Sequence, residues 1–195
     1  GGGAAGVRGP PRARSRPASA AGARPEGLPG RGWKGPARRR ALRRMARLKP
    51  RLAVRALILD AGDRLLLVNA YPEGRSDLWC APGGGCEAGQ SLPENLAREV
   101  REETGLEVDV GPAALVNEFH DPATGFHQVD LYFRCTLRGG TLDPDWRDPE
   151  GVVTERRFFS RVELAAGKIR FKPELLPDAA WGEGCLYDPL EEIVR

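Results

Sequence analysis

The chain has 195 residues and is 41% hydrophobic, which can supply one core of ordinary size but hardly two. Its net charge of +3 hides an asymmetry, because residues 1–50 hold 14 of the 30 Lys and Arg but only one of the 27 acidic residues. The rest of the chain therefore has 16 basic and 26 acidic residues, a net charge of −10. Such an acidic domain is a poor match for a broad nucleic-acid surface, which needs clustered Lys and Arg. No apolar run approaches the roughly 18 residues that span a bilayer, so a soluble protein is expected.

Residues 1–48 are rich in Gly, Ala, Pro and Arg and contain few large apolar side chains. Such a segment cannot bury enough surface to offset the entropy lost on ordering, so we predict a disordered basic tail. Met45 is the only methionine and precedes the patterned sequence, which suggests that residues 1–44 are an over-extended reading frame or a cloning artefact. A transit peptide and nucleic-acid binding by the basic run at residues 38–44 are the alternatives.

The cysteines give no sign of a disulfide framework. Cys80, Cys86, Cys135 and Cys185 are scattered without a CxxC pair, and no secretory signal pattern is present. Reduced thiols and a cytoplasmic location are therefore expected. A zinc site at Cys80 and Cys86 would lack the usual spacing and a nearby His.

Apolar runs predict a domain built mainly of strands. They are expected at residues 51–58, 65–68, 107–116, 128–137 and 151–159. The first two flank a tight turn at residues 60–63, and the fourth alternates through Val129, Leu131 and Phe133. A short helix at residues 161–166 precedes a Pro- and Gly-rich end.

One strong helix stands among these strands. Ser91 can cap its start, Glu94 can complete a capping box, and Gly105 suits the left-handed position beyond its end. Leu92, Leu96 and Val100 form an apolar stripe that can lie on a sheet.

Three glutamates share one face of this helix. Glu99, Glu102 and Glu103 have i, i+3 and i+4 spacing, which brings like charges close together. A Mg²⁺ ion, which prefers hard oxygen ligands, would relieve the repulsion. The alternative is a solvated, salt-bridged face involving Arg98 and Arg101. The glycine run at residues 83–85 favours a site, because backbone without side chains can approach a phosphate or a metal closely.

The stretch from Gly84 to Leu106 resembles the Nudix box, whose pattern is Gly, five residues, Glu, seven residues, then Arg-Glu-apolar-x-Glu-Glu-x-Gly-apolar. Every fixed position matches except one, where Gln90 replaces the first Glu, over a span of 23 residues. The flanking segments 78–85 and 155–164 are also similar to the family, so the resemblance covers about residues 51–170.

The resemblance implies an α/β fold, with an α/β/α sandwich around a mixed β-sheet. The Nudix domain would extend over residues 49–181, followed by a C-terminal extension at residues 182–195. By the same resemblance, Glu102 and Glu103 would be metal ligands, Glu99 a ligand or the general base, and Arg98 the group that orients them. The metal would be Mg²⁺, with Mn²⁺ as an alternative, and the backbone carbonyl of Gly83 would join its ligands.

Further residues are candidates for catalysis and substrate binding. Many family members use another Glu from a later loop, for which Glu150 is the first candidate and Glu155 the second, with a plain loop role as the alternative. Gly84, Gly85 and Trp79 are candidates for substrate binding, with a position in the core as the alternative for Trp79. Several other side chains could border the pocket, with a core or surface role as the alternative: Tyr71, Phe119, His120, Phe126 and His127.

The function implied by the resemblance is Mg²⁺-dependent hydrolysis of the diphosphate linkage in a nucleoside diphosphate derivative or a nucleoside triphosphate. The alternative is a nucleotide-sensing module on the same fold without catalysis, which Gln90 alone supports, since an amide cannot supply the charge of the missing Glu. We expect a small-molecule nucleotide partner, no nucleic acid and no membrane, with a homodimer as an option.

Overall fold

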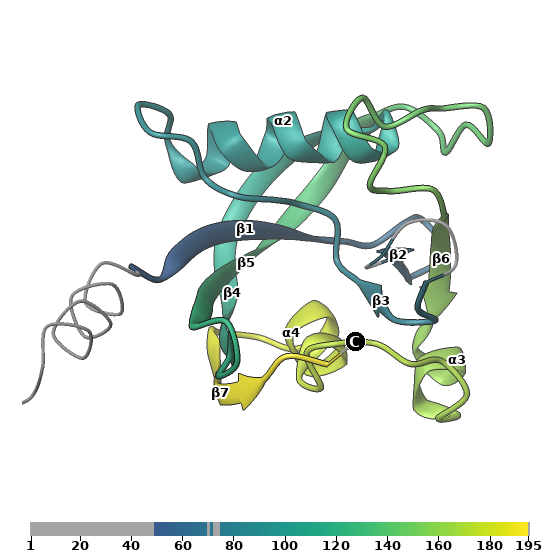
Figure 1. Cartoon of the computed structure of the whole chain (residues 1–195). Coiled ribbons are helices and arrows are strands. Elements are labelled where there is room, and N and C mark those ends of the chain that lie inside the picture. Colours follow the sequence, from purple (N-terminus) through teal and green to yellow (C-terminus); the bar gives the residue numbers. More distant parts are fainter. Residues whose placement is uncertain (1–48, 70, 72–74, 195) are drawn as a thin grey trace, which may run out of the picture.

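The computed structural model describes residues 49–69, 71 and 75–194 (Figure 1). The tail predicted at residues 1–48 lies outside the described residues. Within the described part, no helix is long and apolar enough to cross a membrane.

The main sheet has four strands in the order β1-β5-β4-β7. They are β1 (Arg51–Ile58), β5 (Phe126–Gly139), β4 (Glu107–Asp121) and β7 (Leu186–Glu192). β1 runs parallel to β5, β5 antiparallel to β4, and β4 parallel to β7. The sheet is therefore mixed, as the resemblance implied, and the register of β4 and β5 is irregular between Val110 and Ala113, where Gly111 and Pro112 lie.

A second sheet of three antiparallel strands has the order β3-β2-β6. Its strands are β3 (Trp79–Cys80), β2 (Arg64–Asn69) and β6 (Arg156–Ser160). The two strands predicted around the first turn exist, but β1 and β2 diverge into different sheets. Asp60 shapes the turn between them, because its carboxylate accepts hydrogen bonds from the N–H groups of Gly62 and Arg64, both at 2.9 Å.

Helix α2 (Leu92–Thr104) has the predicted caps. The Ser91 hydroxyl accepts from the Glu94 N–H at 3.3 Å, and the Glu94 carboxylate accepts from the Ser91 N–H at 2.8 Å. Gly105 follows in the left-handed conformation, with φ of 74°. Leu96 and Val100 are fully buried against β1, β4 and β5.

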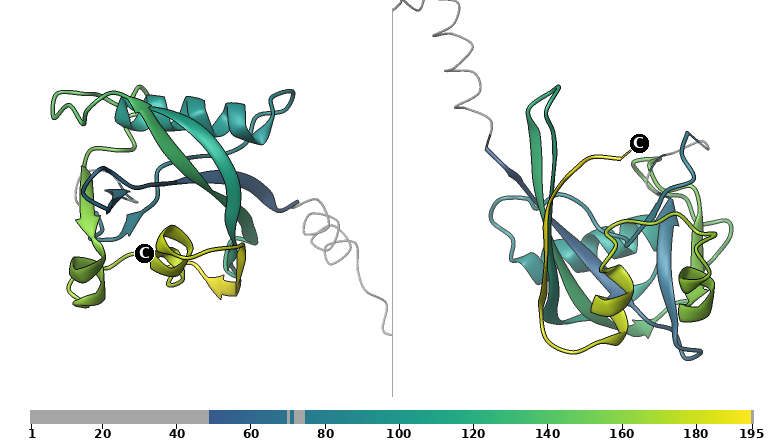
Figure 2. Two further views of the ribbon diagram at one scale, coloured as in Figure 1. Left: turned by 180° about the vertical axis from the view of Figure 1, so that it is seen from behind. Right: turned by 90° about the horizontal axis from the view of Figure 1, so that it is seen from below.

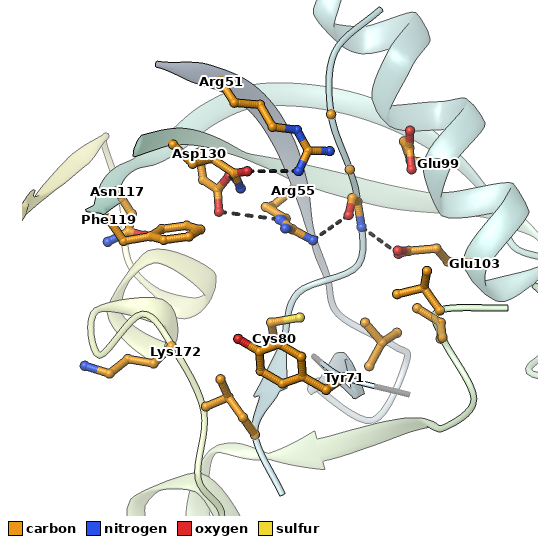
Figure 3. A pocket seen from close by; sticks show the side chains of 18 of the residues that line it. Arg51, Arg55, Tyr71, Cys80, Glu99, Glu103, Asn117, Phe119, Asp130 and Lys172 are labelled. Atoms are coloured by element: carbon orange, nitrogen blue, oxygen red, sulfur yellow. Dashed lines mark hydrogen bonds and ion pairs between the residues drawn. The ribbon is translucent and has the colours of Figure 1, made fainter. Parts of the chain in front are cut away.

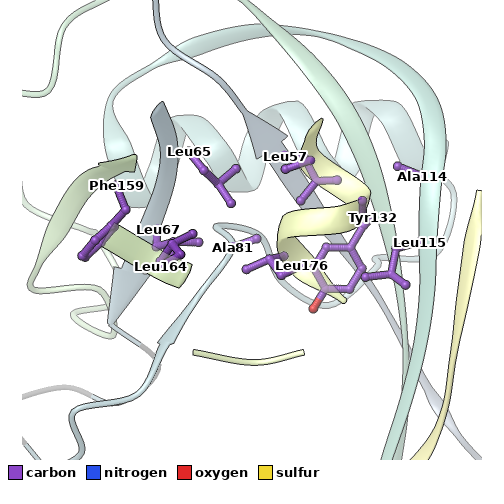
Figure 4. Packing of buried hydrophobic residues seen from close by; sticks show 12 residues of the cluster. Leu57, Leu65, Leu67, Ala81, Ala114, Leu115, Tyr132, Phe159, Leu164 and Leu176 are labelled. Atoms are coloured by element: carbon purple, nitrogen blue, oxygen red, sulfur yellow. The ribbon is translucent and has the colours of Figure 1, made fainter. Parts of the chain in front are cut away.

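The layers agree with the predicted sandwich. Figure 1 shows α2 on one side of the sheets and the short helices α3 (Arg161–Ala165) and α4 (Leu176–Trp181) on the other. Figure 2 shows the same arrangement from behind and from below. A second apolar cluster joins the two sheets to α4, with Leu57, Leu65 and Leu115 among its members (Figure 4).

The end of the chain differs from the sequence prediction. Residues 151–155 form no strand, so the predicted strand at 151–159 shortens to β6, while α4 and β7 were missed. Proline explains both omissions. Pro177 occupies the first turn of α4, where its missing N–H costs no helical hydrogen bond, and Pro189 lies in β7 at the edge of the sheet, where proline is tolerated.

Candidate active site

A segment without bulky side chains separates helix α2 from strand β1. Gly84 and Pro82 accept hydrogen bonds from the β1 N–H groups of Val54, at 2.9 Å, and Ala56, at 2.8 Å. A Cβ atom on Gly84 would collide with the carboxylate of Glu99. Because residues 83–85 carry no side chains, the carboxylates of α2 can lie directly against the backbone of this segment.

Arg98 holds two of the three predicted carboxylates. Its Nη2 donates to Glu99 Oε1 and its Nη1 donates to Glu102 Oε2, each at 2.8 Å. The side chain of Arg98 is only 27% exposed, so these ion pairs are partly shielded from solvent. The structure therefore brings Arg98, Glu99 and Glu102 together in one set of ion pairs.

Glu103 is held separately, against the glycine segment. The Gly83 N–H donates to Glu103 Oε2 at 2.7 Å (Figure 3). Burial raises the pKa of the Glu103 carboxyl to about 7, although Arg55 and the Gly83 N–H act in the opposite direction. Burial likewise raises the pKa of Glu99, with Arg98 opposing the effect. Crowded, buried carboxyl groups of this kind favour a compensating cation.

Two arginines of β1, which the sequence analysis did not single out, face the same region. Arg55 pairs with Asp130 of β5, with Nε and Oδ2 3.5 Å apart, and donates through Nη1 to the Gly83 carbonyl (Figure 3). Arg51 donates to Gln128 at 3.1 Å, and Gln128 in turn donates to Asp130 at 2.6 Å. This chain of contacts fixes the glycine segment to the main sheet.

These groups line a cleft of about 560 Å³ between the main sheet and the second sheet. Its residues are spread over the whole domain, from Arg51 to Val194. Figure 3 shows Glu99 and Glu103 at one end, Phe119 and Asn117 at the other, and Arg51 and Arg55 between them. Cys80 lies on the wall, and burial raises the pKa of its thiol to about 11, so the thiol is uncharged at neutral pH.

Glu150 lines the cleft, whereas Glu155 does not. The loop that carries Glu150 is shaped by Asp148, whose carboxylate accepts from the N–H groups of Glu150, Val152 and Val153 at 3.0, 2.9 and 2.8 Å. The Glu155 N–H instead donates to Asn69 Oδ1 at 2.6 Å, which fastens the loop to β2. The structure thus places the first candidate, and not the second, beside the α2 glutamates.

Trp79, a candidate for substrate binding, is not where the sequence led us to expect it. It is not among the residues that line the cleft; its ring packs edge-on against Phe159, with centroids 4.9 Å apart, beside the core. Alternation of side chains along the extended backbone explains this, because the chain neighbours of Trp79, Leu78 and Cys80, line the cleft. Of the glycines proposed with it, Gly84 and Gly85 both line the cleft.

The other candidate side chains divide between those that line the cleft and those that do not. Tyr71, Phe119 and Phe126 line the cleft. His120 and His127 face each other across the β4–β5 hairpin, with centroids 6.4 Å apart, and do not line it.

Gln90, the departure from the family pattern, is exposed and lies outside the cleft lining. Arg98 instead has a further acidic neighbour in Glu87, with Nη2 and Oε1 3.8 Å apart. Glu87 also lines the cleft, so Arg98 has a third carboxylate beside it in addition to Glu99 and Glu102.

The donor set fits a hard divalent cation in its chemistry, since it offers the carboxylates of Glu99, Glu102 and Glu103. Among the described residues, no three His, Cys, Asp or Glu side chains are already gathered around one point that could hold a metal. The carboxylates are engaged by Arg98 and Gly83, and the Gly83 carbonyl by Arg55. Binding would therefore require these side chains to turn away from their present partners.

An α/β sandwich with glutamates projecting from one helix over a glycine segment is the arrangement that the resemblance to the Nudix family implied. Residues 49–179 match the model of the NUDIX domain, and the chain belongs to the Nudix hydrolase family.

The sequence similarity to individual proteins is low and covers only part of each chain. The chain is 30% identical over 94 residues to YjhB of Bacillus subtilis (strain 168), provisionally named an ADP-ribose pyrophosphatase, covering 47% of this chain and 43% of that protein. It is 27% identical over 116 residues to the NAD-capped RNA hydrolase NudC of Vibrio atlanticus (strain LGP32), covering 59% and 40%. The matches thus span less than half the length of these relatives. The structure of a NUDIX hydrolase from Nitrosomonas europaea matches with a TM-score of 0.55 and 26% identity, over 67% of this chain and 86% of that one.

Proposed function

We propose that this protein is a Mg²⁺-dependent hydrolase that cleaves the diphosphate linkage of a nucleoside diphosphate derivative or nucleoside triphosphate, with Mn²⁺ as an alternative metal. The observation that carries the proposal is the set of α2 carboxylates that line the cleft, with Glu99 lying directly over Gly84. Two relatives, one provisionally named an ADP-ribose pyrophosphatase and the other an NAD-capped RNA hydrolase, support the same class of substrate.

Glu99, Glu102 and Glu103 would hold the metal, which would lower the pKa of a water molecule and neutralise charge on the leaving phosphate. Arg98 keeps Glu99 and Glu102 oriented by donating to one oxygen of each. Glu150 approaches from outside α2, on a separate loop, and is the candidate to accept the proton of the attacking water.

Arg51 suits the binding of a phosphate group in the middle of the cleft. Within the described part of the chain, the partner found for its guanidinium is the neutral amide of Gln128, so its charge is not neutralised by a carboxylate. Arg55, by contrast, is paired with Asp130. A diphosphate between the α2 glutamates and Arg51 would meet positive charge on both sides once the metal is bound.

The sensing alternative is less well supported. It rested on Gln90, and Gln90 is exposed and outside the cleft lining, while Glu99, Glu102 and Glu103 all line the cleft. The replacement of Glu by Gln at position 90 therefore leaves the carboxylates that would carry the reaction in the cleft.

The experiment is a panel of nucleoside diphosphate sugars, dinucleotides and nucleoside triphosphates incubated with Mg²⁺, with release of nucleoside monophosphate or phosphate as the readout. Glu102→Gln should lower kcat/KM by about 100-fold or more, because loss even of groups that support metal ligands costs about 10- to 100-fold. The matched control is Glu183→Gln, the same change at an exposed residue outside the cleft, which should leave kcat/KM unchanged. Turnover should also cease with a chelator and return with Mg²⁺. Binding without turnover of any substrate would instead establish the sensing module.

A further inference from the structure

Asn117 of β4 is a buried side chain with an unmet hydrogen-bonding need. It is 3% exposed, yet it lines the cleft. Its Nδ2 is one of four buried side-chain nitrogen or oxygen atoms without a hydrogen-bond partner in the described part of the chain. Leaving a buried donor unpaired costs free energy, so native proteins seldom keep one without a reason.

The other three unpartnered atoms differ from this one. They are the Nε atoms of Arg55, Arg98 and Arg134, whose guanidinium groups bind elsewhere through their Nη atoms. No such compensation is present at Asn117 Nδ2. Because Nδ2 is itself buried, the amide would turn toward the cleft, where an acceptor on a bound ligand would supply the missing partner.

The surroundings of Asn117 indicate what kind of ligand this is. Phe119 lies two residues further along the same strand, and Phe126 lies on the neighbouring strand β5, with the two ring centroids 6.0 Å apart. Both rings line the cleft with Asn117, and Figure 3 shows Asn117 beside Phe119, away from Glu99 and Glu103. Aromatic faces next to a neutral amide donor suit a flat ring with acceptor atoms on its edge.

A phosphate or a carboxylate fits this end of the cleft less well. Lys172 is the nearby cation, but its Nζ is engaged by Glu191 at 2.7 Å and Glu174 at 3.2 Å. Glu192 also lines this end and adds negative charge. With Lys172 paired and Glu192 adding negative charge, the end opposite Glu99 and Glu103 favours an uncharged aromatic group over an anion.

We infer that Asn117, Phe119 and Phe126 form a nucleobase subsite, in which the Asn117 amide donates to an oxygen or nitrogen acceptor on the edge of the base. This inference rests on the proposed function, because it assigns the base of the same nucleotide whose diphosphate would lie at the α2 glutamates. It places the base, the central Arg51 and the carboxylates in one line along the cleft.

The test measures binding of nucleoside monophosphates by calorimetry, with AMP, GMP, UMP and CMP as probes and ribose 5-phosphate as the probe that lacks a base. These compounds have no diphosphate linkage, so hydrolysis does not affect the measurement. The full-length protein should bind at least one monophosphate about 10-fold more tightly than ribose 5-phosphate. Asn117→Leu, which keeps the volume and removes the unpaired donor, should abolish that preference while leaving Tm the same or higher.

A second variant and a control guard against a misleading result. Phe119→Leu should weaken binding of the monophosphates and leave ribose 5-phosphate unaffected, which supports the subsite even if Asn117→Leu folds poorly. His120→Leu, on the same strand but outside the cleft lining, should bind as the unaltered protein does. Equal affinity for ribose 5-phosphate and every monophosphate, or unchanged binding by both Asn117→Leu and Phe119→Leu, overturns the inference.

The two proposals can fail separately. Base-dependent binding through Asn117 without turnover of any diphosphate would sustain the subsite and reject the hydrolase. Turnover of diphosphates with no dependence on the base or on Asn117 would sustain the hydrolase and reject the subsite.

Discussion

Gly84 shows how the absence of a single side chain shapes the candidate site. Its backbone has no unusual φ, so conformational freedom is not the reason for glycine at this position. The reason is space, because a Cβ atom would occupy the volume of the Glu99 carboxylate. Gly83 differs, since its φ of 136° and the nearby β1 backbone both exclude a side chain.

Gly84→Ala should therefore displace Glu99 and spare the fold. Because Glu99 is a side chain that can move, we expect Tm to change little, while misplacement of the carboxylate lowers kcat/KM by up to about 100-fold. The measurements are thermal unfolding and turnover of whichever diphosphate the panel identifies. Gly139→Ala is the control, since a Cβ there meets nothing within 4 Å. A fully active Gly84→Ala enzyme would show that the position of Glu99 is not critical.

Individual residues differed in how well sequence revealed them. Glu99, Glu102 and Glu103 were found because helical spacing and a family pattern both select them, and the structure gathers them along the cleft with Glu150. Asn117, Gln128 and Asp130 were not found, although polar residues among apolar strand positions are a signal in themselves. Each is 3% exposed or less, so their burial, and with it their significance, depended on contacts that only the fold defines.

Strand β5 was predicted correctly, but the sequence did not reveal the surroundings of its second face. The alternation at residues 128–137 gave the strand and placed Val129, Leu131 and Phe133 on its apolar face. The opposite face is also covered, because Gln128 and Tyr132 are each 2% exposed. A period of two identifies two faces but does not say that the second faces a cleft instead of bulk water. Helix α2 was more predictable, because its caps are local in sequence.

The N-terminal cap of α2 provides a test at the level of one element. Ser91→Ala removes the hydroxyl that accepts from the Glu94 N–H and should destabilise the protein by about 1 kcal/mol. For a domain of this size, that change lowers Tm by about 2–4 °C in a thermal unfolding experiment. Ser91→Thr, which keeps the hydroxyl, should lose less than Ser91→Ala. Equal losses in the two variants would argue against the cap.

At the scale of the whole molecule, the cleft is lined by segments that are far apart in the chain. β1 contributes Arg51, while Val194, near the C-terminus, borders the cleft and accepts a hydrogen bond from Tyr71 at 3.2 Å. β7 belongs to the main sheet through its pairing with β4, so residues 186–192 are part of the fold and not an appendage. Sequence patterns could not place them, because the pairing of distant strands depends on topology and leaves no local periodicity.

Charge divides the molecule at the same place as the family match begins. Residues 1–50 carry 14 basic residues and one acid, whereas the rest of the chain has a net charge of −10, and the NUDIX match starts at residue 49.

We predict that residues 49–195 alone keep the Tm and the kcat/KM of the full chain. On a cation-exchange or heparin column at low salt, the full chain should be retained and the fragment should not, with retention lost as salt rises. If the fragment instead unfolds at lower temperature or loses turnover, residues 1–48 contribute to the domain, and the predicted boundary at residue 49 is wrong.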